Sequence, residues 1–159
     1  DRGASCAPGF VRPPRVNPAT TERKLRRRVS VLELAEVLPA AAVALEPTTD
    51  AEPPVHIDYP DAVQPPALIV IWSEPMLEAP GTMVPGALFG HVGVLAVAGR
   101  LEAGPGVETL QDLVRYVVGR MGAADDVWPL ELVTAPKEFV IANISYLGAR
   151  VDYRVPVAI

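Results

Sequence analysis

Alternating apolar and polar residues mark the last part of the chain as a pair of β-strands. In residues 139–147, and again in residues 151–157, side chains of one kind recur at every second position. This is the period of a strand and not of a helix. Gly148 and Ala149 separate the two patterns, so they are predicted to form the turn of a hairpin. The hairpin is expected to close a half-buried antiparallel sheet.

Three more strands are predicted earlier in the chain. Residues 67–73 (ALIVIWS) form a continuous apolar run rich in β-branched side chains, which is typical of a strand buried on both faces. Residues 91–101 predict a second strand, and residues 130–134 predict a short third one. Residues 46–66 are rich in proline and acidic residues, and we expect them to form a surface loop or an extended arm.

The segment between the first two of these strands, residues 74–90, is predicted to be a long loop. It holds three prolines and three glycines, and a loop of this length inside a compact domain is usually functional or disordered. Its large apolar residues have no place in the predicted core, so we expect a neighbouring subunit or another protein to cover them. These predicted interface residues are Met76, Leu77, Met83, Leu88 and Phe89.

Residues 107–121 give the clearest helical pattern in the chain. Apolar residues recur every three or four positions and charged residues occupy the opposite face, as in a helix that packs one side on a sheet. Arg120 in the last turn suits the helix dipole, and Gly122 is placed to end the helix. The predicted buried stripe is Val107, Leu110, Leu113, Val114, Val117, Val118 and Met121.

A second helix is predicted near the start of the apolar sequence. Ser30 and Glu33 fit a capping box, in which each side chain satisfies a free backbone N–H, so the helix should begin at about Val31. Pro39 removes one backbone donor and should kink or split the helix near Glu36. Its predicted buried stripe is Val31, Leu34, Ala35, Leu38, Ala42 and Leu45.

The order of these elements defines the predicted fold class. A helix, two strands, a second helix and three strands favour an α+β layer. We therefore expect an antiparallel sheet of four to five strands with two helices packed on one face.

Charge divides the chain into two parts. Residues 1–28 hold eight basic and two acidic side chains, a net charge of +6, whereas residues 29–159 have a net charge of −11. The first part lacks hydrophobic periodicity and is predicted to be a basic flexible extension, and the second a single domain. The extension could bind DNA or an acidic partner. Alternatively, Lys24 to Arg28 could be back-translated as a ribosome-binding stretch before a GUG start at Val29, which would place residues 1–28 outside the natural protein.

Composition also narrows the function classes. The acidic body should repel nucleic-acid phosphates rather than grip them. Cys6 is the only cysteine, so an intrachain disulfide or a cysteine metal site is excluded. We find neither an apolar run long enough to span a bilayer nor the apolar core of a secretory signal, so we expect a soluble, intracellular protein without membrane contact.

Candidate catalytic and metal-binding residues are few. His56 and Asp58 could form a metal pair, but two ligands are fewer than a metal site needs. His91, at the start of a strand, is better explained as a capped or interfacial residue. Ser73 and Ser145 lie within strand patterns and lack the small-residue elbow that exposes a catalytic serine.

Three other groups of residues have simpler explanations. Cys6 has no histidine near it in the sequence to activate it. Residues 104–106 could bind an anion at a helix start, but Glu108 follows and no phosphate-binding motif is present. The loop acids Asp58, Asp61, Asp125 and Asp126 are expected to be solvated. We therefore predict no catalytic residues, no metal and no cofactor.

Residues 30–159 resemble the tail terminator, or tail-completion, proteins of long-tailed bacteriophages. The resemblance includes the N-terminal helix, the strand ALIVIWS, the Pro/Gly-rich loop, the strand HVGVLAVAGRL, the helix VETLQDLVRYVVGRM and the ending FVIANISYLGARVDYRVPV. Its most characteristic piece is the turn at residues 146–149 with the strand that follows. The basic extension and the acidic, proline-rich segment depart from the family pattern.

The resemblance implies a structural virion protein and not an enzyme. Members of this family form homohexameric rings that cap the tail tube and join it to the head–tail connector or stopper protein, while DNA passes through the ring without sequence-specific binding. The protein would then lie at the head–tail junction of the virion, and in the host cytoplasm during assembly. A head–tail stopper or neck protein is one alternative and would favour an all-β barrel. A small ferredoxin-like enzyme or ligand-binding domain is another.

Overall fold

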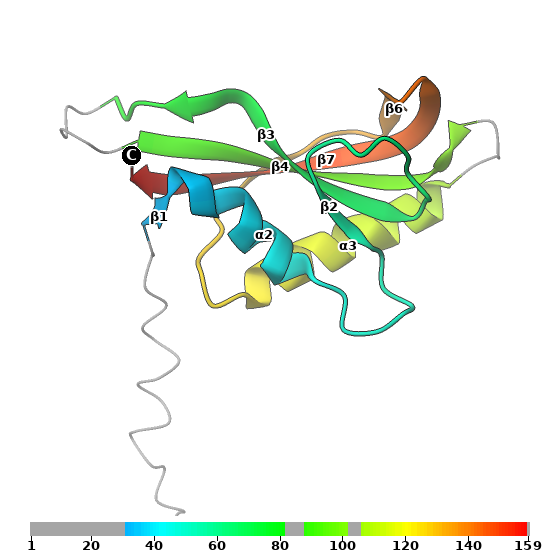
Figure 1. The fold of residues 1–159 in the computed structure, drawn as a ribbon, viewed down its shortest axis with the longest axis horizontal. Coiled ribbons are helices and arrows are strands. Elements are labelled where there is room, and N and C mark those ends of the chain that lie inside the picture. Colours follow the sequence, from blue (N-terminus) through cyan, green and yellow to red (C-terminus); the bar gives the residue numbers. More distant parts are fainter. Residues whose placement is uncertain (1–30, 82–87, 102–105, 159) are drawn as a thin grey trace, which may run out of the picture.

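The computed structural model describes residues 31–81, 88–101 and 106–158, which form an α+β fold (Figure 1). Two α-helices lie on one side of a curled sheet. The elements are β1 (Leu32–Glu33), the 3-10 turn η1 (Leu34–Glu36), α2 (Val37–Leu45), β2 (Val55–Ile57), β3 (Ala67–Glu78), β4 (Leu88–Arg100), α3 (Val107–Ala123), β5 (Leu130–Val133), β6 (Lys137–Ile141) and β7 (Ile144–Ala158). The predicted extension, residues 1–28, lies outside the described residues.

The predicted antiparallel sheet of four to five strands is only partly matched, because the sheet is mixed and has seven strands. Its main path is β1-β7-β4-β3-β2, and β5 and β6 also pair with β7. The β1–β7 and β2–β3 pairs are parallel, and the other pairs are antiparallel. β1 and β2 have only two and three residues, too few to show a period of two in the sequence.

The closing hairpin exists, but its turn lies six residues before the predicted one. Ala142 and Asn143 connect β6 to β7, with positive φ angles of 50° and 63°, as the tightest hairpin turns require. Gly148 and Ala149 lie inside β7, which continues to Ala158. Gly148 serves close packing instead: a Cβ there would lie 2.8 Å from the carbonyl oxygen of Ala96 on β4.

Helix α3 confirms the strongest prediction from the sequence. It begins at Val107 as expected and ends at Ala123. Leu110, Leu113, Val117 and Met121 are buried, while Val107 and Val118 at the margins of the stripe remain exposed.

The N-terminal helix begins later than predicted. Val31 is 61% exposed, residues 32–33 form β1, and α2 begins only at Val37 with no side-chain cap. The predicted capping box is therefore wrong. The expected interruption near Glu36 is present, because the 3-10 turn η1 ends there and α2 begins at the next residue. Pro39 lies in the first turn of α2, where a backbone N–H would have no partner within the helix. The buried stripe shifts accordingly to Val37, Ala41 and Leu45.

Most of the described residues in the predicted loop at residues 74–90 are strand. β3 continues to Glu78 and β4 starts at Leu88, so residues 79–87 connect the two strands. The segment that was interpreted as the start of a loop is a bulge in β3. Between the Trp72–Val92 and Leu77–Gly90 pairs, four residues of β3 lie opposite the single residue His91 of β4. Pro75 and the exposed Met76 lie within this bulge, and there β3 arcs away from the helices (Figure 1).

The sheet has a helix-covered face and an open face. Alternate residues of β3, β4 and β7, including Val70, Val94 and Val151, pack with both helices in the main core. The remaining residues point to the open face, where a smaller core forms around Ile69, Leu95 and Tyr146. The Tyr146 hydroxyl donates a hydrogen bond of 3.2 Å to the carbonyl oxygen of Val63, which holds the loop before β3 over this face.

Tyr153 lies in the main core and leads to a prediction about alkaline pH. It is 2% exposed, its hydroxyl has no hydrogen-bond partner among the described residues, and burial raises its pKa to about 12. An unfolded tyrosine has a pKa of about 10. Ionisation of Tyr153 therefore leaves the free energy of unfolding unchanged below about pH 10. Between pH 10 and about 12 the free energy of unfolding falls, because the tyrosine ionises in the unfolded chain before it ionises in the folded one.

Tyr153→Phe should therefore stabilise the fold by about 1 kcal/mol at pH 7, since it removes a buried hydroxyl without a partner. It should also flatten the decline of the melting temperature (Tm) above pH 10. Thermal melts of both proteins from pH 7 to 11.5 test this. A Tyr153→Phe protein that melts below the wild type at pH 7 would show that the hydroxyl contributes a favourable bond.

Candidate functional site

The predicted interface residues lie on the paired ends of β3 and β4. We use the term arm for residues 74–81 and 88–90. Met76 is 39% exposed, whereas Leu77, Leu88 and Phe89 are half-buried. Met83 lies outside the described residues. The apolar side chains are therefore gathered on one end of the sheet, but on strands rather than on the predicted loop.

A polar cluster on the open face lies at the base of the arm. His91 of β4 is 6% exposed, and each of its ring nitrogens contacts a carboxylate. Nε2 lies 3.0 Å from Oε2 of Glu78 on β3, and Nδ1 lies 2.9 Å from Oε2 of Glu131 on β5. The same Glu78 oxygen lies 3.4 Å from Nη2 of Arg154 on β7. Four strands thus contribute to what we call the His91 cluster.

Backbone irregularities aim both carboxylates at the histidine. Glu78 follows the β3 bulge directly. Glu131 is the extra residue of a second bulge, because Leu130 pairs with Tyr153 and Leu132 pairs with the adjacent Asp152. Bulges commonly redirect side chains in this way. Arg154 needs no irregularity, since it is the register partner of His91.

Aromatic packing connects the His91 cluster to the arm. The guanidinium carbon of Arg154 lies 4.3 Å from the ring centroid of Phe89, a cation–π geometry. The backbone N–H of Arg154 donates to the carbonyl oxygen of Pro129, just before β5. Arg154 therefore contacts the arm on one side and the start of β5 on the other.

A second polar group lies further along the same face. The Ser73 hydroxyl donates a 2.7 Å hydrogen bond to Oδ1 of Asp152, and Nε of Arg150 lies 2.8 Å from the same oxygen. Ser73 and Asp152 are 5% and 3% exposed. Gly93 makes room for them, because a Cβ at this position would lie 2.7 Å from Oγ of Ser73. The Asp152 carboxylate is therefore shared between the Ser73 hydroxyl and the Arg150 guanidinium.

The remaining candidates from the sequence do not converge. His56 is half-buried in β2 and Asp58 is exposed. Among the described residues no group of three or more His, Cys, Asp or Glu side chains could hold a metal ion. Asp125 and Asp126 line a different surface cavity from Asp61. Cys6, Gly104 and Pro105 lie outside the described residues.

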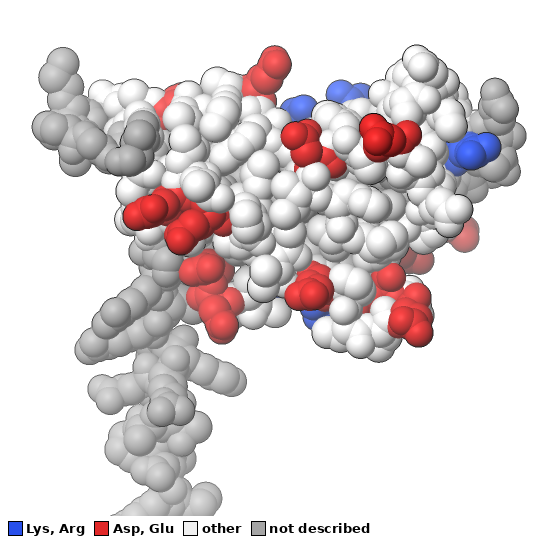
Figure 2. All heavy atoms as spheres, viewed as in Figure 1, with Lys and Arg blue, Asp and Glu red and all other residues white. Residues whose placement is uncertain are grey.

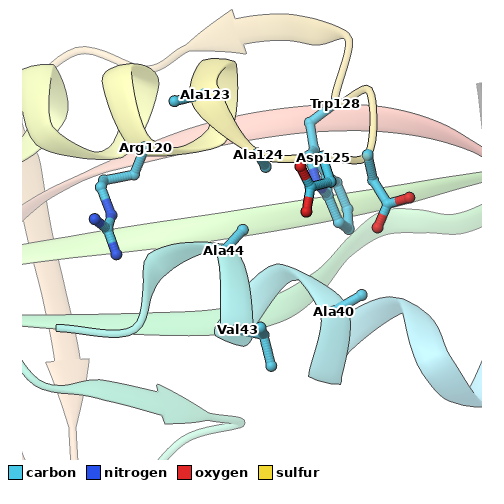
Figure 3. A pocket seen from close by; sticks show the side chains of 9 residues that line it. Ala40, Val43, Ala44, Arg120, Ala123, Ala124, Asp125 and Trp128 are labelled. Atoms are coloured by element: carbon cyan, nitrogen blue, oxygen red, sulfur yellow. The ribbon is translucent and has the colours of Figure 1, made fainter. Parts of the chain in front are cut away.

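Figure 3 shows the cavity between α2 and the end of α3. It has a volume of about 330 Å³. Alanines from both helices face one another across it, with Arg120 at one end and Trp128 and Asp125 at the other. Nε1 of Trp128 and Nε of Arg120 have no hydrogen-bond partner among the described residues, but both atoms are covered from solvent. A ligand in the cavity could reach them only after the surrounding side chains moved.

Among the charged side chains on the visible face (Figure 2), acidic ones predominate. On the face drawn in Figure 2, Asp and Glu form several separate patches over the helical layer and the sheet, and Lys and Arg are few. No helix of the described segments is both long and apolar enough to cross a membrane.

The sequence was compared with protein-family models and with curated proteins. No protein-family model matches the sequence, and no curated protein matches it either. The described residues form an α+β fold whose open sheet face holds a polar cluster centred on the buried His91, beside an apolar arm.

Sequence reasoning missed most of this cluster. His91 was expected to be capped or interfacial, and it is in fact paired with two carboxylates. Glu131 stands between Leu130 and Leu132 in a short strand, where simple alternation gives no sign of its partner. The one available signal was the alternation of Asp152 and Arg154 with apolar residues in β7, which correctly placed both on the face away from the main core.

Proposed function

We propose that this chain is a structural assembly protein of the phage tail-terminator type, which forms a closed ring at the end of a tail tube. The observation that carries the proposal is the arm, where Met76 exposes 39% of its surface beside three half-buried apolar side chains. Exposed apolar groups that cluster in this way mark interfaces. A ring needs such a surface on every subunit to meet a different surface on the next one.

The two edges of the sheet support this proposal. On one edge, β5 is exposed along its whole length, and Leu130, Leu132 and Val133 each expose between 44% and 49% of their surface. On the opposite edge, Ile57 of β2 is 50% exposed and the following Tyr59 is 53% exposed. Apolar residues on unlike edges suit head-to-tail contacts between copies, since bare strand edges pair readily with other chains.

The charge of the body suits a DNA conduit. Residues 29–159 have a net charge of −11, and a ring lumen lined by acidic groups would let DNA phosphates pass without sticking. In this proposal the partners are further copies of the chain, expected as a hexamer, together with the tail tube protein and the head–tail connector or stopper.

The fold bears on the two alternatives, a head–tail stopper and a ligand-binding domain. The stopper alternative favoured an all-β barrel, whereas α3 covers much of one face of the sheet here. A ligand-binding domain would use the cavity between α2 and α3, which is lined by four alanines, Val43 and Trp128 together with the charged Arg120, Asp125 and Asp126. The arm and the sheet edges favour assembly.

Met76→Glu tests the arm as an interface. The variant should fold, because Met76 is exposed, and it should lose assembly, because a charge would be buried against the neighbouring copy. Val118→Glu on the outer side of α3 is the matched control, since Val118 is 37% exposed. Mass photometry and negative-stain microscopy of the purified full chain should show rings for the wild type and the control, and monomers for Met76→Glu.

Rings of normal size from Met76→Glu would exclude the arm as the subunit interface. In a phage that encodes this chain, deletion of the gene should give filled heads separated from tails. Normal tailed particles after the deletion would exclude the terminator function itself.

A further inference from the structure

Helix α2 is apolar on every side, although it lies at the surface. Its nine residues are VLPAAAVAL, and none has a polar side chain. A helix that is apolar all round is normally buried. Val37, Ala41 and Leu45 are buried against the core, but Pro39 is exposed and Val43 exposes 68% of its surface. The outer face of α2 is therefore left uncovered by the described residues.

Two cavities flank this outer face, and Val43 lines both of them. The first is the cavity of about 330 Å³ between α2 and α3 that Figure 3 shows. The second has a volume of about 520 Å³, lies between α2 and β2, and is lined mainly by proline and aliphatic side chains. A segment of chain that crossed α2 at Val43 could place apolar side chains in both cavities.

The rim of the α2 face is acidic. Glu46 lines the cavity beside β2, and Asp125 and Asp126 line the cavity beside α3. Glu36, which directly precedes α2, is exposed. Arg120 is the one basic residue among the described residues that line either cavity, and its guanidinium donates a hydrogen bond to the carbonyl oxygen of Glu46. An apolar face with an acidic rim favours an occupant that is both apolar and basic.

Charge distinguishes three candidate occupants within this protein. A second copy of the α2 face would bring its own acidic rim, and like charges that meet across an interface are unfavourable. The arm would bring the exposed Glu74 and Glu78. The basic extension, residues 1–28, has a net charge of +6 and carries apolar residues such as Phe10 and Leu25 among its arginines. Of the three, the extension complements both the apolar face and its rim.

The extension is joined to the chain close to the same helix. Only η1 separates β1, which begins at Leu32, from α2. Leu25 lies seven residues before Leu32, and seven extended residues span up to about 23–25 Å. Helix α2, with nine residues, is about 13 Å long. Leu25 and the five basic residues of segment 23–28 can therefore reach the outer face of α2 in their own chain.

We propose that the basic extension docks on the outer face of α2 in its own chain. Its apolar side chains pack against Val43 and into the flanking cavities, and its basic side chains lie on the acidic rim. The docked segment covers an apolar surface that water would otherwise contact. Salt screens the attraction between the two charges and releases the segment. The docking takes place within one chain and does not depend on ring formation.

Trypsin digestion of the full chain tests the proposal, because trypsin cleaves after lysine and arginine and segment 23–28 holds five of them. Val43→Lys is the informative variant. It places a cation on the docking face and should fold, since Val43 is exposed. Val140→Lys is the matched control, because Val140 of β6 is 65% exposed and lines neither cavity. Mass spectrometry follows cleavage at about 0.05 M and about 0.5 M NaCl. An isotope-labelled peptide of residues 1–28 in the same tube corrects for the activity of the protease.

At low salt, segment 23–28 should be cleaved about tenfold more slowly in the wild type and Val140→Lys than in Val43→Lys, as for a segment docked about 90% of the time. At high salt the three rates should converge. Equal rates at low salt would overturn the proposal. So would a wild-type rate, relative to the peptide, that salt leaves unchanged, a result that requires no variant to fold. Rapid cleavage in the wild type together with strong hydrogen-exchange protection of α2 would assign the face to another occupant instead.

Discussion

Leu113→Asp should abolish stable folding, whereas Arg115→Ala two residues away should leave Tm almost unchanged. Leu113 is 6% exposed and lies where α3 packs on the sheet. The substitution loses the buried leucine and places a carboxylate in an apolar site without a partner, which together cost about 4–5 kcal/mol. This is comparable to the whole stability of a small domain.

Arg115 is the matched control because it lies on the other face of α3. Its side chain is 76% exposed, and its 3.2 Å contact with Asp112 is an exposed ion pair worth at most a few tenths of a kcal/mol. Circular dichroism and thermal melts compare the two variants. Equal melting temperatures would show that α3 does not pack through the Leu113 face.

Gly148→Ala should destabilise the fold by about 2–3 kcal/mol, although it adds a single methyl group. The new Cβ would lie 2.8 Å from the carbonyl oxygen of Ala96 and 3.0 Å from Cδ2 of Phe139. The first of these neighbours is backbone held in the β4–β7 ladder, so the strands would have to separate. Urea unfolding measures the change.

The same substitution at Gly119 should act in the opposite direction. Gly119 lies on the exposed side of α3 with nothing within 4 Å of an added Cβ, so Gly119→Ala should stabilise the helix by about 1 kcal/mol. A Gly148→Ala protein as stable as the wild type would show that close packing at this position does not require glycine.

Elements with a long, regular period were predictable. α3 has four buried positions at helical spacing, and β7 has Val151, Tyr153, Val155 and Val157 on one face, so α3 and residues 151–157 of β7 were predicted with their faces correct. The turn was misplaced because glycine is the usual sign of positive φ, and here Ala142 and Asn143 adopt it while Gly148 is extended. Short strands such as β1 form only because β7 offers an edge to pair with.

The candidate site was less accessible to sequence reasoning. Met76, Leu77, Leu88 and Phe89 were correctly recognised as apolar residues with little place in the main core, but the prolines among them were taken as signs of a loop and not of a bulge. The partners of His91 depend on two bulges, and a bulge shifts every later residue to the other face. No local pattern shows where such an extra residue is accommodated.

The position of β7 near the end of the chain means that the sheet cannot be completed until late in synthesis. β7 pairs with β4 along most of its length and receives β6, β5 and β1 on its other edge, yet it is the last described element to leave the ribosome. Until it emerges, β4 presents an unpaired edge and its apolar residues have no second neighbour. Contacts as distant as that of Leu32 with Val157 also make folding slow. A chain interrupted anywhere before β7 cannot complete the sheet, and cellular quality control should remove it.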